Sequence, residues 1–202
     1  LSRFRFFRVF DPGSSERLIS VPGSYLLDTS SLHLRLSSQE ELAGIAALHA
    51  SPEVDRYNTL GVINDQVVIE QMVADWEAEH LKEQPRTFVF SLISKKEHAF
   101  AGLICIFLGA ARFRSAEVWY KLLPEAWGKG YATEATKAVI DFGFDELNLH
   151  RIEAGCAVAN VSSYRVLEKA GMKREGHKRQ ALPLKSGWSD CYEYAILKKD
   201  FY

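Results

Sequence analysis

The order of predicted elements indicates an α+β protein with one mixed, mostly antiparallel sheet flanked by helices. Three observations in the 202-residue sequence support this fold class. Two helical patterns come early, between residues 38 and 80. Strand-like segments then follow one another from residue 87 to residue 122. A strand–helix–strand succession comes last, and it adds one crossover to an otherwise antiparallel sheet.

The earliest segments read as strands separated by turns. Residues 3–10 and 32–36 have strand-like composition, and Pro12-Gly13 and Pro22-Gly23 between them are turn signals. Arg3 and Arg5 alternate with aromatic residues, which fits an added strand as well as a mitochondrial address. We therefore expect residues 1–202 to form a single domain, with residues 1–31 as an N-terminal extension that adds a strand or hairpin.

Two helices are predicted next. Ser38 and Glu41 form a capping box, and the helix that they start should end near Ser51. The second helix should run over residues 65–80, with an acidic, solvated counter-face. Its apolar face is predicted from three residues spaced four apart: Val68, Met72 and Trp76.

The middle of the chain changes to the two-residue period of strands. Residues 87–93 and 99–108 are rich in β-branched and apolar residues, and a charged turn at 95–97 joins them into a hairpin. A third strand is expected over residues 115–122. Alternation places Glu117, Trp119 and Lys121 on one face of that strand, and Val118, Tyr120 and Leu122 on the other.

The last third contains the crossover. After a turn at Gly128 and Gly130, apolar residues from 135 to 142 follow the helical period. A strand at 150–158 leads to Asn160, which suits the N-cap of a short helix ending at Gly171. Two final strands are expected at 178–184 and 192–197, joined by a turn at 185–187.

Composition excludes several classes of protein. The 25 Lys and Arg nearly balance the 26 Asp and Glu, so no field of one sign indicates a nucleic-acid partner or an acidic membrane. No apolar run approaches the roughly 18–20 residues needed to cross a bilayer. The six histidines are dispersed, so no metal site is expected. Cys105, Cys156 and Cys191 read as core thiols, which favours a reducing, cytoplasmic location.

The segment with the clearest chemistry is a strand, Pro124, a turn with Gly128 and Gly130, and then a helix. Such a turn presents free N–H groups at the positive end of a helix dipole, which suits a phosphate or pyrophosphate. A tight turn without a ligand explains the same glycines. The spacing fits neither a P-loop nor a dinucleotide fingerprint, because the glycine and hydroxyl positions of those motifs are not filled.

Three segments in order resemble the GNAT superfamily of N-acetyltransferases, most nearly its RimJ/RimL-like branch. The first is Trp127-Gly128-Lys129-Gly130-Tyr131-Ala132, which is similar to the coenzyme A motif of that superfamily. The second runs from Asn160 through Ser163 to Gly171, and the third comprises Glu175-Gly176 and Tyr192-x-Tyr194. The resemblance covers roughly residues 32–197 and implies a sheet splayed in its middle, with acetyl-CoA in the split.

The resemblance also implies how the cofactor is held. Trp127 stands where the superfamily has Gln or Arg, so backbone N–H groups from Gly128 to Ala132 should carry most of the phosphate binding. Lys129 adds a flexible counter-charge or is simply solvated. The residues implied in cofactor binding are Leu122, Leu123, Trp127, Gly128, Lys129, Gly130, Tyr131, Ala132, Thr133, Asn160 and Ser163.

Two catalytic residues are implied. Glu117 is the candidate base that takes a proton from the amine, because a carboxylate in an apolar cleft has a raised pKa; a solvated strand carboxylate is the alternative. Ser163 is the candidate acid for the thiolate, with Tyr164 as a weaker one, because Leu167 occupies the position of the superfamily tyrosine. A helix-start serine is the alternative for Ser163. The N–H near Leu122 or Leu123 should polarise the thioester carbonyl.

The implied activity is direct transfer of an acetyl group from acetyl-CoA to a primary amine, either a protein N-terminus or a small molecule. A catalytically silent domain that binds coenzyme A as a scaffold is the alternative. The expected partners are the amine acceptor and, in a homodimer, a second copy of the chain; a monomer is equally compatible with the sequence.

Overall fold

The computed structural model describes residues 25–201, so the strand predicted at 3–10 lies outside the described residues. The strands are β1 (Tyr25–Asp28), β2 (Leu32–Leu36), β3 (Thr87–Ser94), β4 (Phe100–Leu108), β5 (Ser115–Leu122), β6 (Arg151–Ala157), β7 (Lys173–Leu184) and β8 (Gly187–Leu197). The helices are α1 (Leu42–Ala50), α2 (Pro52–Asp55), α3 (Gln66–His80), α4 (Tyr131–Asp145), α5 (Val161–Lys169) and α6 (Lys198–Phe201). Three 3₁₀ turns, η1 (Gln39–Glu41), η2 (Ala111–Phe113) and η3 (Pro124–Ala126), complete the described elements.

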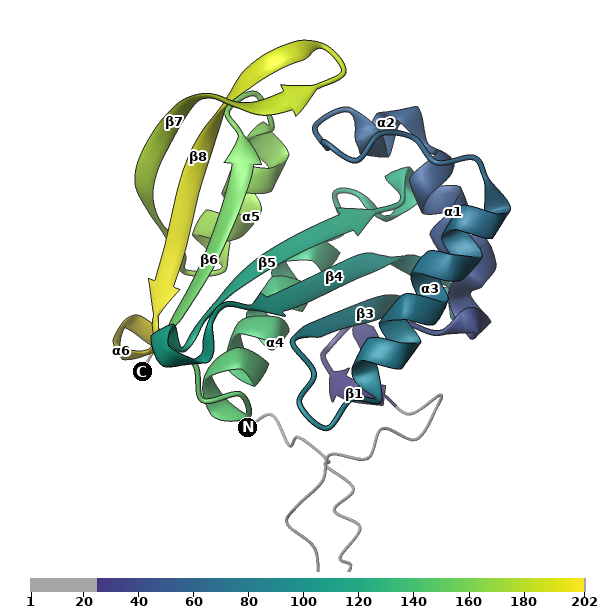
Figure 1. Ribbon diagram of the computed structural model, residues 1–202, viewed down its shortest axis with the longest axis horizontal. Coiled ribbons are helices and arrows are strands. Elements are labelled where there is room, and N and C mark those ends of the chain that lie inside the picture. Colours follow the sequence, from purple (N-terminus) through teal and green to yellow (C-terminus); the bar gives the residue numbers. More distant parts are fainter. Residues whose placement is uncertain (1–24, 202) are drawn as a thin grey trace, which may run out of the picture.

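The described strands form one sheet in the order β1-β2-β3-β4-β5-β6-β8-β7. All neighbours are antiparallel except β5 and β6, which run parallel and pair only from Ser115–Glu117 to Arg151–Glu153. Beyond these residues the two strands diverge into a V that opens towards α2 and the end of the β7–β8 hairpin (Figure 1). The mixed, mostly antiparallel sheet that is splayed in its middle is therefore confirmed.

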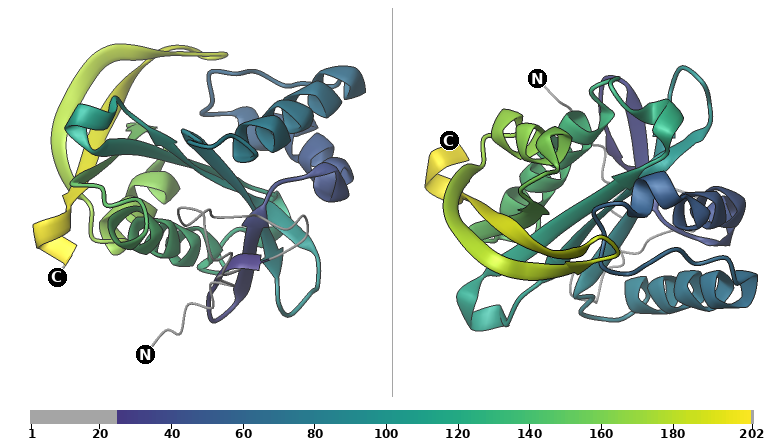
Figure 2. Two further views of the ribbon diagram at one scale, coloured as in Figure 1. Left: turned by 60° about the horizontal axis from the view of Figure 1, so that its bottom comes forward. Right: turned by 90° about the horizontal axis from the view of Figure 1, so that it is seen from above.

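Helices cover both faces of the sheet, with α4 and α5 on one side and α1 and α3 on the other (Figure 2). The core under α4 includes the edge-to-face pair Phe90 and Phe142, whose ring centroids are 5.7 Å apart. A second core joins Ile45 of α1 and Val73 of α3 to Leu103 of β4. Strands β3 and β4 are thus buried on both faces, whereas one face of β6 and most of β7 are exposed.

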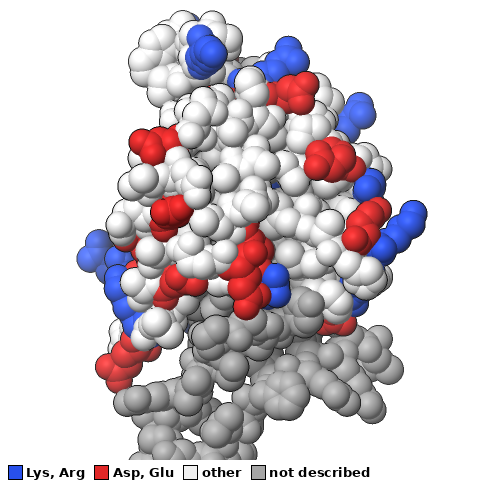
Figure 3. All heavy atoms as spheres, turned by 90° about the vertical axis from the view of Figure 1, so that its right-hand side faces the viewer, with Lys and Arg blue, Asp and Glu red and all other residues white. Residues whose placement is uncertain are grey.

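The face over the early helices carries mixed charge. Asp and Glu are spread across it, and Lys and Arg lie mainly towards its edges (Figure 3). Within the described residues this face therefore has no continuous basic surface of the kind that nucleic acids require.

The start of the early helices follows the predicted capping box. The Ser38 side chain accepts from the Glu40 N–H at 3.3 Å, and the Glu41 carboxylate accepts from the Ser38 N–H at 3.1 Å. The box begins η1, which leads into α1. The helix α2, which was not predicted from the sequence, starts where α1 stops, because Ser51 caps it and Pro52 fits its first turn.

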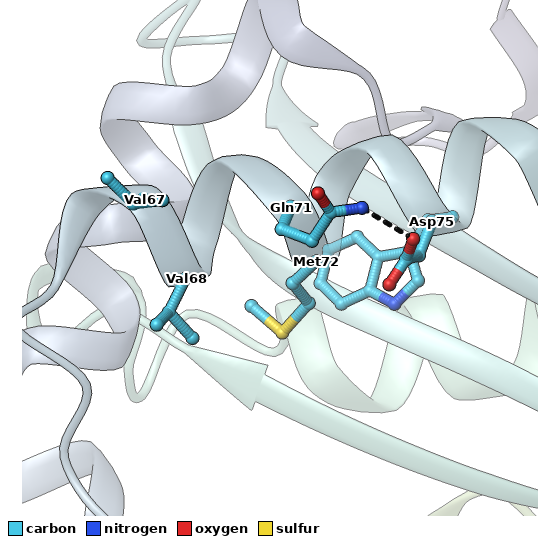
Figure 4. Close-up of a pocket in the computed structure, with 6 residues that line it drawn as sticks. Val67, Val68, Gln71, Met72 and Asp75 are labelled. Atoms are coloured by element: carbon cyan, nitrogen blue, oxygen red, sulfur yellow. Dashed lines mark hydrogen bonds between the residues drawn. The ribbon is translucent and has the colours of Figure 1, made fainter.

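The most buried residues of α3 lie one position after the predicted ones. Ile69 and Val73 are buried, whereas Val68 is 47% exposed. Consecutive apolar residues begin this helix, so its periodicity does not distinguish two adjacent stripes. The predicted residues Met72 and Trp76 do pack against the second core. Together with Val68 and neighbouring residues they line a shallow hollow along the helix (Figure 4).

The last hairpin is longer than predicted. Strands β7 and β8 begin five residues before the predicted starts at 178 and 192, although the turn at 185–187 is correct. Most of β7 is exposed, so its polar sequence lacks the alternation that marks a half-buried strand. A bulge between Lys178 and Leu182, with Gln180 at a φ of +47°, bends the hairpin. Strand β1, within the predicted extension, also had no clear sequence signal.

Candidate active site

The turn from β5 into α4 depends on its two glycines. Gly128 and Gly130 have φ values of +73° and +83°, in the left-handed region that L side chains avoid. A Cβ built on either glycine would have no atom of the described part of the chain within 4 Å, apart from the neighbouring residues. The backbone is therefore open on this side, and a ligand can approach it closely.

Six consecutive N–H groups at this turn lack a partner among the described residues. They belong to Gly128, Lys129, Gly130, Tyr131, Ala132 and Thr133, and the first N–H bonded within α4 is that of Glu134, which donates to the Gly130 carbonyl at 3.0 Å. The groups lie at the positive end of a 15-residue helix. This arrangement fits a pyrophosphate, which offers several anionic oxygens to such a row of donors.

Two side chains of the turn are engaged with the protein. The Trp127 indole Nε1 donates to the Leu122 carbonyl at 2.8 Å and so fixes the end of β5. The Lys129 Nζ lies 3.2 Å from a Glu97 carboxylate oxygen, so Lys129 is ion-paired. Hydrogen bonds from Ser94, Lys129 and Tyr131 lower the pKa of Glu97 to about 2. A lysine ammonium and an ionised carboxylate therefore sit together beside the anion-binding turn.

The backbone of β5 presents donors to the split. Hydrogen bonds alternate along the antiparallel β4–β5 pair, and the Leu123 N–H donates to the Ala101 carbonyl at 3.0 Å. By the same alternation, the N–H groups of Tyr120 and Leu122 point towards β6, beyond Glu117, where the β5–β6 pairing ends. Of the two predicted carbonyl-polarising donors, Leu122 faces the opening and Leu123 does not, because Leu123 is paired with β4.

Ser163 lies at the start of α5, across the split from β5. The Asn160 side chain accepts from the Ser163 N–H at 3.2 Å, which confirms Asn160 as the helix cap. The Ser163 hydroxyl is 2.9 Å from the Tyr120 hydroxyl, and Tyr120 donates to the Ser163 carbonyl at 3.0 Å. Burial raises the pKa of Tyr120 far above its usual value, so this phenol stays protonated.

Tyr120 is the site residue that was not identified from the sequence. Strand alternation places it only on the same face of β5 as Val118 and Leu122, and nothing in the spacing of motifs pairs it with Ser163. The weaker candidate Tyr164 instead packs against Tyr192, with ring centroids 6.0 Å apart. Leu167 is buried, at 1% exposure, and provides no donor.

Glu117 is placed at the narrow end of the split, away from the other predicted residues. Its register partner is Glu153 of β6, and its side chain is exposed, so the expected apolar surroundings are absent. Three strand residues, about 10 Å, separate Glu117 from Tyr120. The turn at 127–133, Leu122 and the start of α5 come together at the open end instead, because the carboxyl ends of the parallel strands β5 and β6 share one edge.

Two classes of feature are not found among the described residues. No helix there is long and apolar enough to cross a membrane. No group of three or more His, Cys, Asp or Glu within residues 25–201 is placed to hold a metal ion.

Comparison with known proteins matches the same part of the chain. A family model described as "Acetyltransferase (GNAT) domain" matches residues 31–173. The uncharacterized N-acetyltransferase p20 of Bacillus licheniformis is 30% identical over 175 residues, which are 87% of this chain and 97% of p20. The uncharacterized N-acetyltransferase YnaD of Bacillus subtilis is 39% identical over 112 residues, 55% of this chain and slightly under two thirds (65%) of YnaD.

Solved structures share the fold. A GNAT-family acetyltransferase from Bacillus anthracis superposes with a TM-score of 0.74 at 29% identity, covering 86% of this chain and 98% of that one. At lower identity the likeness shows the fold alone. Ribosomal-protein-S5-alanine acetyltransferase from Vibrio fischeri has a TM-score of 0.77 at 23% identity, covering 87% and 97%. Spermidine N-acetyltransferase from Vibrio cholerae, solved with CoA and spermine, has a TM-score of 0.75 at 24% identity, covering 85% and 98%.

Proposed function

The chain belongs to the GNAT acetyltransferase domain family, and from this premise we propose that it is an enzyme that transfers the acetyl group of acetyl-CoA directly to a primary amine. One observation carries the proposal. Six N–H groups that have no partner among residues 25–201 stand at the start of α4, beside the open end of the β5–β6 split. This combination offers a place for a pyrophosphate and, next to it, a gap in the sheet for the arm that carries the acetyl group.

The cofactor-binding residues follow from this placement. The backbone from Gly128 to Thr133 would hold the pyrophosphate, and the Leu122 N–H would bond an acyl or amide oxygen in the split. Acetyl-CoA supplies an activated acetyl thioester there. Asn160 and Ser163 line the opposite side, and Trp127 holds the strand end in position through the Leu122 carbonyl.

The proton transfers are assigned to two side chains. Glu117 would accept the proton of the attacking amine through water, since its exposed carboxylate lies on β5 below the open end of the split. Ser163 would donate a hydrogen bond to the departing sulfur, with its hydroxyl positioned by Tyr120. Neither step requires a metal ligand or a covalent enzyme intermediate.

The finer placement of the protein is also proposed. We assign it to the RimJ/RimL-like branch on the motif at 127–132, with an amine as its acceptor, by analogy with the Vibrio cholerae spermidine N-acetyltransferase that was solved with spermine. Three buried, unpaired cysteines suit a reducing cytoplasm. The acceptor is the partner that this site requires, in a monomer or a homodimer.

The proposal is tested by thiol release from acetyl-CoA in the presence of a panel of amines and peptides, with the acetylated product identified by mass. We expect acetyl-CoA to bind and at least one amine class to be acetylated. Binding without turnover on any amine would indicate the silent, coenzyme A-binding alternative. Failure to bind acetyl-CoA would overturn the proposal altogether.

A further inference from the structure

Two buried polar side chains on the early helices have polar atoms with no partner. His49 at the end of α1 is 3% exposed and Asp55 of α2 is 6% exposed. Neither ring nitrogen of His49 nor the Oδ1 atom of Asp55 has a hydrogen-bond partner among the described residues. The other buried atoms of this kind belong to Arg35 and Glu41, which form an ion pair with each other. Buried polar groups are normally bonded, so the atoms of His49 and Asp55 call for partners that the described residues do not supply.

A lysine from β5 joins them. Lys121 is half-buried, and burial lowers its pKa while the nearby Asp55 carboxylate acts in the opposite direction. Burial lowers the pKa of His49 to about 4, and the Lys121 charge adds to that shift. Among the described residues no ion pair joins Lys121 to Asp55, so both charges are available to a third partner.

This cluster lies on the side of the sheet opposite the anion-binding turn. The Lys121 side chain points away from the face of Tyr120 and Leu122, which packs under α4 and α5. Its neighbour Leu122 has its N–H in the split, and α2 stands at the open end of the V in Figure 1. A molecule held between the early helices and β5 therefore reaches the split from one side, while the cofactor reaches it from the other.

The charges in the cluster indicate the chemistry of this molecule. Asp55 provides an anionic acceptor for an ammonium group, and Lys121 provides a cationic donor for a carboxylate. His49 is neutral at pH 7 and offers one donor and one acceptor. A polycation would place a positive charge against Lys121 with only one carboxylate in the cluster to offset it.

We infer that His49, Asp55 and Lys121 bind the acetyl acceptor, and that this acceptor is a zwitterionic amine with a carboxylate close to its primary amine, as in a free amino acid. The inference rests on the proposed function and specifies its acceptor. Asp55 holds the ammonium until the amine loses its proton, and Lys121 fixes the carboxylate. Amines without a carboxylate are bound less well.

The test compares amino acids with their amides, and both with spermidine, at saturating acetyl-CoA. We expect kcat/KM for the preferred amino acid to exceed that for its amide by about ten- to a hundredfold, the effect of one charge-assisted bond. Lys121→Met should abolish this preference by lowering only the amino-acid value, and Lys121→Arg should retain it. Asp55→Asn should lower kcat/KM for every amine. Lys137→Met, on the exposed side of α4, is the matched control and should change nothing.

Calorimetric titration of each variant with acetyl-CoA keeps folding separate from acceptor recognition, because the affinity should stay within about twofold. Equal rates for amino acid and amide, a preference for spermidine, or an unchanged preference in Lys121→Met would overturn the inference while leaving the acetyltransferase proposal standing. Absence of turnover on every amine in the wild-type enzyme would instead reject the proposed function.

Discussion

Tyr120 and Ser163 share two hydrogen bonds across the split, but Tyr120 has one hydroxyl proton to donate. That proton goes to the Ser163 carbonyl, so the Ser163 hydroxyl donates to the Tyr120 oxygen. To bond a thiolate, Ser163 must turn its proton away from Tyr120. The pKa of Tyr120 is raised by burial, so the phenol does not replace that proton at neutral pH. In the proposed role, the pair would therefore stabilise the sulfur by hydrogen bonding and not by complete proton transfer.

Removal of either hydroxyl should have a modest, coupled effect. A hydrogen bond to sulfur contributes about 1–2 kcal/mol, so Ser163→Ala should lower turnover by about 5–30-fold. Tyr120→Phe should lower it by a smaller factor, and in the Ser163→Ala background it should add almost nothing. Turnover measured on the two single variants and the double variant checks this. Effects that multiply would show that the two hydroxyls act independently.

Glu117 and Glu153 provide a matched pair for the assignment of the base. They are register partners on β5 and β6, both exposed, but Glu153 is bonded to Arg151 at 2.5 Å. Glu117→Gln should lower turnover about a hundredfold, the low end for general base catalysis, because this carboxylate acts from solvent. Glu153→Gln should leave turnover nearly unchanged. If both variants retain wild-type rates across pH 6–9, the base is another group.

At the scale of the element, the β5–α4 turn combines two left-handed glycines, an open side and a row of N–H donors in one short segment. Gly130 is the N-cap of α4 in a left-handed conformation, and no side chain caps the helix. Helix N-termini usually bond their free N–H groups to a cap such as Ser or Asn. The missing cap leaves those donors to a ligand, whereas Asn160 caps α5 in the usual manner.

Gly130→Ala should weaken acetyl-CoA binding at least tenfold, because the added Cβ occupies the open side of the turn and strains its φ of +83°. Gly61 supplies the control, since its φ is +84° and a Cβ there also has no neighbour within 4 Å. Both variants should lose about 1–2 kcal/mol of stability. Only Gly130→Ala should change the affinity measured by calorimetry. Equal affinities would place the phosphates elsewhere.

The elements were predictable where their signals are local. The Ser38 capping box, the Asn160 cap and the turn at 185–187 all appear where the sequence places them. The predicted apolar face of α3 was wrong at Val68, because several adjacent apolar residues begin that helix and the sequence does not show which of them is buried. The strand starts in β7 and β8 were wrong because exposed polar strands lack a two-residue period. Tertiary packing decides these features, and a single sequence does not encode it locally.

Across the whole molecule, two histidines make stability depend on pH. Burial lowers the pKa of both His49 and His80 to about 4. The His80 Nε2 accepts from the Val89 N–H at 3.2 Å, which requires the neutral ring. In the unfolded chain both titrate near a pKa of about 6.5. Below that pH the unfolded state binds protons that the folded state does not, so stability falls as the pH drops from about 6.5 to 4 and is unaffected by these groups above it.

The free energy of unfolding should therefore fall by up to about 1.4 kcal/mol per pH unit for each histidine in this window. His80→Gln retains an acceptor for the Val89 N–H but does not titrate, so it should remove its part of the loss. Urea unfolding at pH 7.5, 6, 5 and 4.5 on both proteins measures the difference, in which the contributions of carboxylates cancel. Parallel curves would contradict the assignment.

The candidate site was predictable only in part, because some of its residues are contiguous in the sequence and others meet only in the folded molecule. The motif around Gly128 and Gly130 is contiguous, so the sequence locates the open turn. Tyr120 meets Ser163 only through the packing of α5, and on the other side of the sheet Asp55 comes near Lys121 only through the packing of α2. The apolar neighbours Val118 and Trp119 indicate an apolar environment for the Glu117 carboxylate. In the structure the Val118 side chain lies on the other face of β5, and Glu117 is exposed. Contacts between residues far apart in the chain cannot be read from a single amino-acid sequence.

The short parallel contact between β5 and β6 leaves a gap in the backbone hydrogen bonding of the sheet. Three residue pairs, from Ser115 to Glu117, join the half of the sheet with β1–β5 to the half with β6–β8. The two halves also share the core beneath α4 and α5, and the hydrogen bonds between Tyr120 and Ser163 cross the split. The opening is therefore maintained by side-chain packing. A slender molecule would not have to separate paired strands in order to lie in it.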